Sequence, residues 1–319
     1  MKKTIIALGA LAGAGAAAFY AFNEWAYRAL IHADFEIPKA LGKKISQNEA
    51  ADYSSVSDEC KAWIENYGYD KYNLLNKDGN WLVGYHLKPK KKSKVFVFGS
   101  HGYRSEGKGE WCYYAKHYVE ELGYNLFFVD HQGAGSSTGQ YVGFGSFESR
   151  DCLDWLEFMN NTFGKDIKII LHGISMGSAT VMLMTGSGKL PENVKFTIAD
   201  CGYTSALDEF TYKLESLGVP KKPLIPYLSG KNLARAGYDF QKDTNALDAV
   251  TRAKVPMLFI HGDKDKFVPT YMVHQLYDNC GAPYKDKLIV EGADHAESYL
   301  IAPEKYESKI NEFIEMFVK

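Results

Sequence analysis

Short apolar runs recur along the chain, and segments with helical periodicity separate them. At residues 81–85 apolar residues alternate with other types, which predicts a half-exposed strand. Six further runs are unbroken and rich in Val, Ile, Leu and Phe, as in strands that are buried on both faces. They comprise residues 95–98, 126–129, 167–171, 196–199, 257–260 and 288–290.

The segments between these runs predict amphipathic helices. They cover residues 111–122, 147–163 with Ser146 as a candidate cap, 176–184 and 271–277. A last helix begins at Pro303, and its apolar residues recur on one face. Strands that alternate with helices predict one α/β domain, with a mostly parallel sheet and helices on both faces.

The segment 205–253 interrupts this alternation, because it contains no predicted strand and is broken by three prolines. We interpret it as a helical lid inserted above the carboxyl ends of the strands. The predicted organisation is therefore an N-terminal anchor or signal (1–24), a lead-in segment (25–80) and the main α/β domain (81–319).

The N-terminus carries Lys2 and Lys3, followed by an uncharged run over residues 4–22. In a helix this run is roughly 28 Å long, close to the thickness of a bilayer core. We favour an uncleaved membrane anchor, with Trp25 at the interface. A signal peptide cleaved near residues 16–18 and a soluble packed helix are the alternatives. Either of the first two places the rest of the chain outside the membrane.

The overall composition is that of a globular protein, with 46% hydrophobic and 24% charged residues. A net charge of −2 argues against a nucleic-acid partner. The five cysteines are widely spaced and form no C-x-x-C motif, so we expect small buried residues and no zinc site. In an exported chain a disulfide could form, but no pair is indicated. They are Cys60, Cys112, Cys152, Cys201 and Cys280.

Chemically informative residues follow the predicted strands. Residues 173–177 read G-I-S-M-G and lie between the strand at 167–171 and the helix at 176–184. This strand, turn and helix context is typical of a nucleophile elbow. We therefore predict Ser175 as the nucleophile, held at a helix N-terminus where backbone N–H groups face an anion.

A serine nucleophile needs a base, and the base needs an acid to orient it. His295 follows the last predicted strand and is the candidate base. Asp263 and Asp265 both follow the strand at 257–260. Asp263 suits a turn close to the strand, whereas Asp265 extends further toward a neighbouring loop, so we prefer Asp265 as the acid.

The reaction also needs N–H donors for the oxyanion. The backbone N–H of Met176 lies at the elbow, and the N–H of Tyr103 follows the strand at 95–98. Gly102 permits a close approach of that loop. We assign His101 a structural role in packing it.

These motifs together resemble the α/β-hydrolase superfamily, from about Trp81 to the C-terminus. The resemblance is narrower to bacterial membrane-anchored, Bem46-like serine hydrolases. It implies a Ser175–Asp265–His295 triad and a carboxylic-ester-type hydrolase. One departure is His131, where relatives often place arginine after the aspartate. The matching motifs are H-G at 101–102, D-x-x-G-x-G-x-S at 130–137, G-I-S-M-G at 173–177, A-D-C-G-Y-T-S at 199–205, H-G-x-x-D-x-x-V-P at 261–269 and E-G-A-D-H-A-E at 291–297.

The sequence thus predicts a serine esterase for small acyl substrates that uses no cofactor or metal. The glycines around Gly133 lack the spacing of a dinucleotide loop, and Asp294 and Glu297 have no histidine cluster beside them. A serine peptidase or amidase with the same triad remains an alternative, as does a non-catalytic binding module on the same fold.

Overall fold

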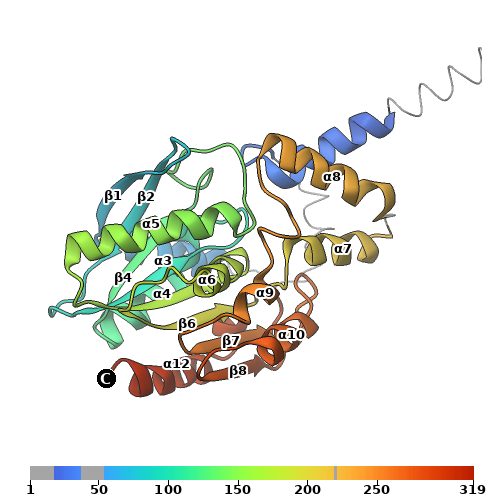
Figure 1. Ribbon diagram of the computed structural model, residues 1–319. Helices are drawn as coiled ribbons and strands as arrows, with labels where there is room; N and C mark the ends of the chain where they lie inside the picture. The colour runs from blue at the N-terminus through green and yellow to red at the C-terminus, as the bar shows by residue number, and fades with distance from the viewer. Residues whose placement is uncertain (1–17, 37–53, 219–220) are drawn as a thin grey trace, which may run out of the picture.

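The computed structural model describes residues 18–36, 54–218 and 221–319. Its centre is an eight-stranded sheet with the order β1-β2-β4-β3-β5-β6-β7-β8 (Figure 1). The two pairs β1–β2 and β2–β4 are antiparallel, and all other neighbours are parallel. The strands are β1 (Asp70–Leu75), β2 (Trp81–Leu87), β3 (Val95–Ser100), β4 (Asn125–Asp130), β5 (Lys168–Ile174), β6 (Val194–Asp200), β7 (Met257–Gly262) and β8 (Lys285–Val290).

Helices cover both faces of this sheet, which confirms the predicted fold class. Successive side chains of a strand point to opposite faces. Val97 accordingly packs with one apolar cluster, and its neighbours Phe96 and Phe98 pack with another. The first face carries α4 (Gly107–Lys116) with its continuation η1 (His117–Glu121), α12 (Pro303–Phe317) and, packed on α4, α3 (Ser54–Tyr67). The second carries α5 (Ser146–Phe163), α6 (Met176–Gly186) and α10 (Tyr271–Asn279).

The sheet begins earlier than the sequence pattern indicates. β1 lies within the segment 25–80 that we expected to be a lead-in, and it pairs with β2 along its whole length. Its residues alternate between half-buried and exposed positions. An edge strand of this kind has no unbroken apolar run, and its polar and charged residues conceal the pattern.

Two local expectations can be compared with the structure: the cap predicted for α5 is wrong, and the cysteines are largely buried as expected. The N-cap of α5 is Gly145, not Ser146, and the carboxylate of Glu148 accepts hydrogen bonds from the N–H groups of Gly143 and Gly145. All five cysteines are free thiols; four are buried and Cys60 is half-buried.

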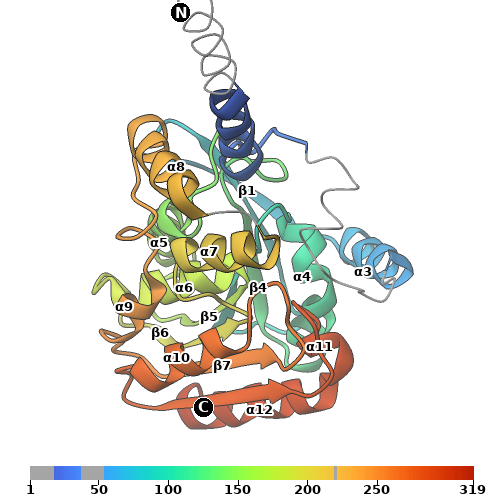
Figure 2. The ribbon, with the colours of Figure 1, turned by 90° about the vertical axis from the view of Figure 1, so that its right-hand side faces the viewer.

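Helices also connect β6 to β7, and the described residues 205–218 and 221–253 contain no strand. They are α7 (Ala206–Ser216), α8 (Lys221–Arg235) and α9 (Ala246–Val250). α9 packs closely on α6, whereas α7 and α8 lie together beyond the carboxyl edge of the sheet (Figure 2).

An N-terminal helix spans residues 18–31 of the described chain and lies beside α8 (Figures 1 and 2). Most of the expected anchor (1–24) lies outside the described residues. Within the described ranges, no helix has the length and apolar character needed to cross a bilayer.

The contact between α6 and α9 generates a stability prediction. A Cβ on Gly186 would lie 2.2 Å from the backbone oxygen of Ala249, so the helices must separate to admit it. Gly186→Ala is expected to lower the free energy of unfolding by about 1–3 kcal/mol. The matched control Gly230→Ala in α8 meets no atom within 4 Å and should raise it by about 0.4–1 kcal/mol. Denaturant titration measures both, and equal effects would contradict the prediction.

Candidate active site

Ser175 occupies a strained turn between the end of β5 and the start of α6, with φ of 55° and ψ of −114°. A non-glycine residue rarely adopts such a positive φ. The flanking glycines leave no room for a side chain. A Cβ on Gly173 would lie 2.1 Å from the oxygen of Gly177, and one on Gly177 would lie 2.0 Å from the oxygen of Ser100. The G-x-S-x-G motif thus forms the expected sharp turn.

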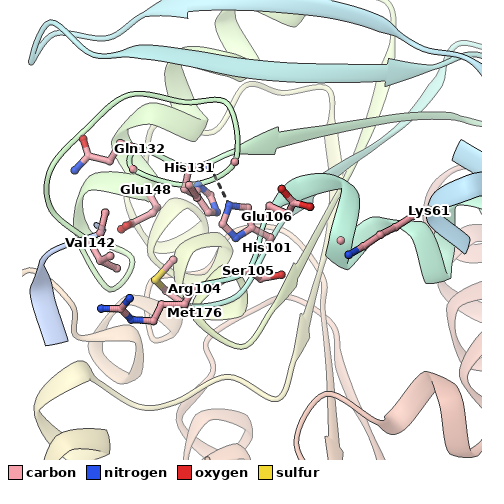
Figure 3. A pocket seen from close by; sticks show the side chains of 15 residues that line it. Lys61, His101, Arg104, Ser105, Glu106, His131, Gln132, Val142, Glu148 and Met176 are labelled. Carbon is pink, nitrogen blue, oxygen red and sulfur yellow. Dashed lines mark hydrogen bonds between the residues drawn. The ribbon is translucent and has the colours of Figure 1, made fainter. Parts of the chain in front are cut away.

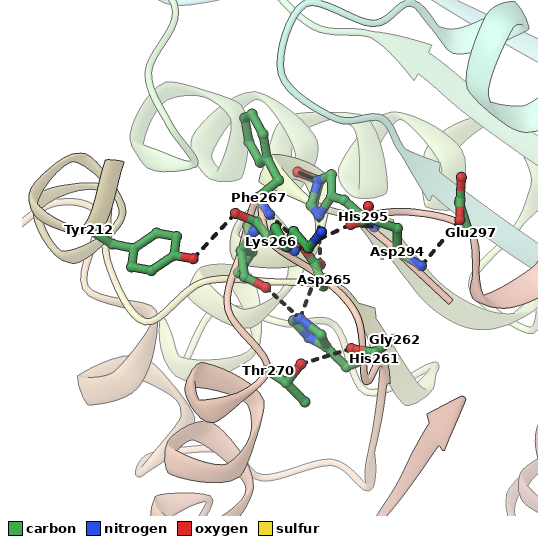
Figure 4. Close-up of polar contacts among 12 residues, drawn as sticks. Tyr212, His261, Gly262, Asp265, Lys266, Phe267, Thr270, Asp294, His295 and Glu297 are labelled. Atoms are coloured by element: carbon green, nitrogen blue, oxygen red, sulfur yellow. Dashed lines mark hydrogen bonds and ion pairs between the residues drawn. The ribbon is translucent and has the colours of Figure 1, made fainter. Parts of the chain in front are cut away.

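The structure brings Ser175, His295 and Asp265 together from the ends of three strands. The Ser175 hydroxyl lies 2.9 Å from Nε2 of His295. Nδ1 of the same ring lies 2.8 Å from Oδ2 of Asp265 (Figure 4). This is the geometry in which a base can accept the serine proton while a carboxylate holds the ring.

The loop after β7 distinguishes the two candidate aspartates. Asp265 is buried, and its Oδ1 accepts hydrogen bonds from the N–H groups of Phe267 (2.9 Å) and Val268 (2.8 Å). Its Oδ2 also lies 3.1 Å from Nε2 of His261 (Figure 4). Asp263 instead accepts a bond from the N–H of Gly292 and closes the turn. The preferred aspartate is therefore the one that contacts His295.

Asp265 and His295 each shift the pKa of the other. Burial alone raises the pKa of Asp265, but the neighbouring His295 and His261 outweigh it and hold that pKa well below its usual value. Burial also lowers the pKa of His295, and the Asp265 carboxylate outweighs this effect, so that the pKa lies well above the ordinary 6.5. The buried pair favours an ionised aspartate that can stabilise an imidazolium.

The loop after β3 lies directly against the nucleophile. A Cβ on Gly102 would be 3.3 Å from the Cβ of Ser175. Among the described residues, no hydrogen bond occupies the backbone N–H of Tyr103 or of Met176. Both N–H groups are thus available at the point where we predict the oxyanion donors.

His101 is buried within this loop and bonded to backbone. Its Nδ1 lies 2.8 Å from the carbonyl oxygen of Gly102, and its Nε2 accepts from the N–H of His131. The ring of His131 in turn bonds the hydroxyl of Ser100 at 2.9 Å. His131 therefore has a defined place in the packing of this loop.

An apolar cavity of about 280 Å³ borders Ser175. Its wall comes from the loop after β3, from α7 and α8, and from the N-terminal helix. Aliphatic and aromatic side chains form most of it, and the aromatic ones include Tyr103, Phe144, Tyr203, Phe210, Phe240 and Phe267. Such a lining suits an acyl chain better than a charged group.

A second, polar cleft has a volume of about 500 Å³ (Figure 3). His101, Arg104, Glu106 and His131 line it, and Ser175 does not. Ser175 instead lines the apolar cavity.

Glu209 and Lys213 also line the apolar cavity, and the sequence analysis did not single them out. They stand one turn apart on α7, a spacing that could have marked them as a pair. Neither carboxylate oxygen of Glu209 has a hydrogen-bond partner among the described residues, and burial raises its pKa to about 8. The ammonium group of Lys213 donates to the carbonyl of Lys266 and lies 3.9 Å from the centre of the Phe267 ring.

One group of residues in the described chain has the donor atoms for a metal ion, namely His117, Glu121 and Glu307. Nδ1 of His117 lies 2.9 Å from Glu121 and 3.5 Å from Glu307, so contacts among these three side chains account for the cluster. Asp294, which flanks His295, accepts hydrogen bonds from the N–H groups of Lys266 and His295 instead.

Comparisons with known proteins cover this site. Residues 91–200 match the family described as serine aminopeptidase, S33, and residues 169–296 match serine hydrolase (FSH1). The turn that carries Ser175 lies within both matches.

Three relatives align with much of the chain. YqkD of Bacillus subtilis, described as uncharacterized, is 27% identical over 99% of this chain and 98% of its own. Mouse monoglyceride lipase is 26% identical over 71% of this chain and 83% of its own. The Schizosaccharomyces pombe protein bem46 is 23% identical over 69% of this chain and 68% of its own.

A solved esterase from Pyrococcus furiosus shares the fold. The two structures superpose with a TM-score of 0.64 at 19% identity, over 80% of this chain and 93% of the esterase. This similarity shows a shared fold.

The buried Glu209 carboxyl generates a pH prediction. Its pKa rises from 4.5 to about 8 on folding, so the folded protein holds a proton that the unfolded chain releases between these values. Stability should therefore fall as the pH rises from 5 to 9. Glu209→Gln removes this titration, and we expect a gain in stability over wild type of up to about 5 kcal/mol at pH 9 but little difference at pH 5. Denaturant titrations at the two pH values test this, and a gain that is independent of pH would refute it.

Proposed function

We propose that this chain, which resembles Bem46-like proteins of the α/β-hydrolase superfamily, is a serine hydrolase that cleaves carboxylic esters through a triad of Ser175, His295 and Asp265. One observation carries the proposal: the chain of hydrogen bonds from Asp265 through His295 to Ser175 ends at the wall of an apolar cavity.

In the proposed reaction the Ser175 hydroxyl attacks the ester carbonyl while Nε2 of His295 takes its proton. Asp265 stabilises the resulting imidazolium, and the N–H groups of Tyr103 and Met176 bind the oxyanion. The imidazolium then protonates the departing alcohol, which leaves an acyl-enzyme. A water molecule, deprotonated by His295, releases the acid and restores Ser175.

The apolar lining supports an uncharged acyl chain as the group held beside Ser175. The similarity to mouse monoglyceride lipase supports an ester with a single such chain. We propose that α7 and α8 act as a lid over this cavity, because both helices contribute to its wall.

A serine peptidase or amidase is the second candidate, and the match to the serine aminopeptidase family over residues 91–200 favours it. An amide needs better protonation of its leaving group than an ester. Hydrolysis rates on an ester and an amide with the same acyl group separate the two candidates. Labelling of Ser175 by a fluorophosphonate excludes a non-catalytic module.

For location we propose attachment to a membrane through the N-terminal segment, with the catalytic domain on the outer side. The uncharged run over residues 4–22 supports attachment, and the lysines at positions 2 and 3 support this orientation. Secretion after cleavage is the alternative.

Replacement of the nucleophile tests the mechanism. Ser175→Ala removes the attacking oxygen, so kcat on a nitrophenyl butyrate should fall by at least about 10³-fold. Ser187→Ala, at the exposed end of α6, is the matched control and should change the rate by less than about twofold. Residual activity of Ser175→Ala near the wild-type level would refute the mechanism.

The charge of Asp265 generates a second prediction. Asp265→Asn removes the group that raises the pKa of His295, so the rise of kcat/KM with pH should shift to lower pH. The maximal rate should also fall by about 10³-fold, because the ring is no longer oriented. A pH–rate profile measures both effects. Asp263→Asn should keep the wild-type midpoint, and the same shift in that control would contradict the assignment.

A further inference from the structure

The N-terminal helix (residues 18–31) supplies part of the substrate cavity. Its lining residues recur at the spacing of one helical face, which is the pattern of a helix packed against the body of a protein. They are Phe22, Trp25, Ala26, Ala29 and Leu30. The segment that the sequence suggested as an anchor or signal therefore ends inside the candidate active site.

The exposure of these residues locates the mouth of the cavity. Phe22 is 47% exposed and Trp25 is 37% exposed, although both line the cavity. Deeper lining residues such as Ser175 (6%) and Tyr203 (3%) are buried. The cavity thus opens beside the N-terminal helix, where Phe19 and Tyr20 are exposed as well.

Polar contacts hold the middle of this helix against α8. The carboxylate of Glu24 pairs with Lys231 (2.5 Å) and Arg235 (2.7 Å) on α8. Hydrogen bonds from Arg235 and Lys231 hold the pKa of Glu24 at about 2. The helix and α8 are therefore coupled at physiological pH.

The C-terminal end of the helix is held by Tyr103 and Arg104 of the loop after β3. The Tyr103 hydroxyl donates to the carbonyl of Leu30 at 2.9 Å. The guanidinium of Arg104 donates to the carbonyls of Ala29 (2.9 Å) and His32 (3.1 Å). Because the last carbonyls of a helix have no partner within it, these bonds act as a cap. The helix is thereby placed against the loop that carries a proposed oxyanion donor.

We propose that acyl esters pass from a lipid surface into the cavity through the mouth beside the N-terminal helix. This inference rests on the proposed ester hydrolysis. The exposed aromatic side chains at the mouth are the type that lies at a membrane interface. The chain that leads to them carries no charge from residue 4 to residue 22, which favours lipid over a polar protein partner as the surface in contact.

The test compares one ester in lipid with one in water. Full-length protein is assayed on a nitrophenyl palmitate embedded in phosphatidylcholine vesicles and on dissolved nitrophenyl butyrate. The double variant Phe19→Ser, Tyr20→Ser changes exposed aromatic residues that do not line the cavity. It should lose about tenfold in kcat/KM on the vesicle ester, because it lacks apolar surface beside the entrance, and less than about twofold on the soluble ester. Trp81→Ser, an exposed aromatic residue on β2, should change neither rate.

The outcomes separate this inference from the proposed function. Wild-type protein that hydrolyses neither ester would refute the proposed ester hydrolysis itself. Active wild-type protein with an equal loss on both esters in the double variant would show a structural role for the helix and overturn the inference. So would unchanged activity of the double variant on the vesicle ester. Thermal unfolding of the double variant within a few degrees of wild type shows that it folds.

Discussion

The strained turn at Ser175 is the constraint on which the active site depends. A residue in this conformation costs roughly 1–3 kcal/mol, so the surrounding packing must hold it there. β5 lies at the centre of the sheet, and α6 crosses so close to the β3 loop that a side chain at Gly177 would overlap the backbone of Ser100. The same close packing that leaves no room at Gly177 brings the loop after β3 against Ser175.

The parallel arrangement of β5, β7 and β8 explains why three distant segments meet. Their carboxyl ends share one edge, and each ends in a loop that carries one polar group toward it. Burial strengthens the interaction of Asp265 with His295, because little water screens it. The two N–H groups that bond the other oxygen of Asp265 keep the carboxylate fixed and ionised.

The apolar cavity ties substrate binding to parts of the chain that carry no catalytic motif. α7, α8 and the N-terminal helix all contribute to its wall, and Glu24 links the last two. Glu209 and Lys213 are the charged residues in this lining, and the Glu209 carboxyl is buried without a hydrogen-bond partner among the described residues.

The sequence by itself determined the parallel strands and the helices between them, because burial leaves local apolar patterns. It also determined the elbow at Ser175, because the sharp turn requires the flanking glycines. It also indicated His295 and Asp265, since both follow strands whose ends must share an edge. The amphipathic edge strand β1 was missed, because half-exposed residues leave a weak pattern. Only the tertiary structure decided that the N-terminal helix and Glu209 line the same cavity as Ser175. These contacts join residues far apart in the chain, and no local pattern records how the chain folds back on itself.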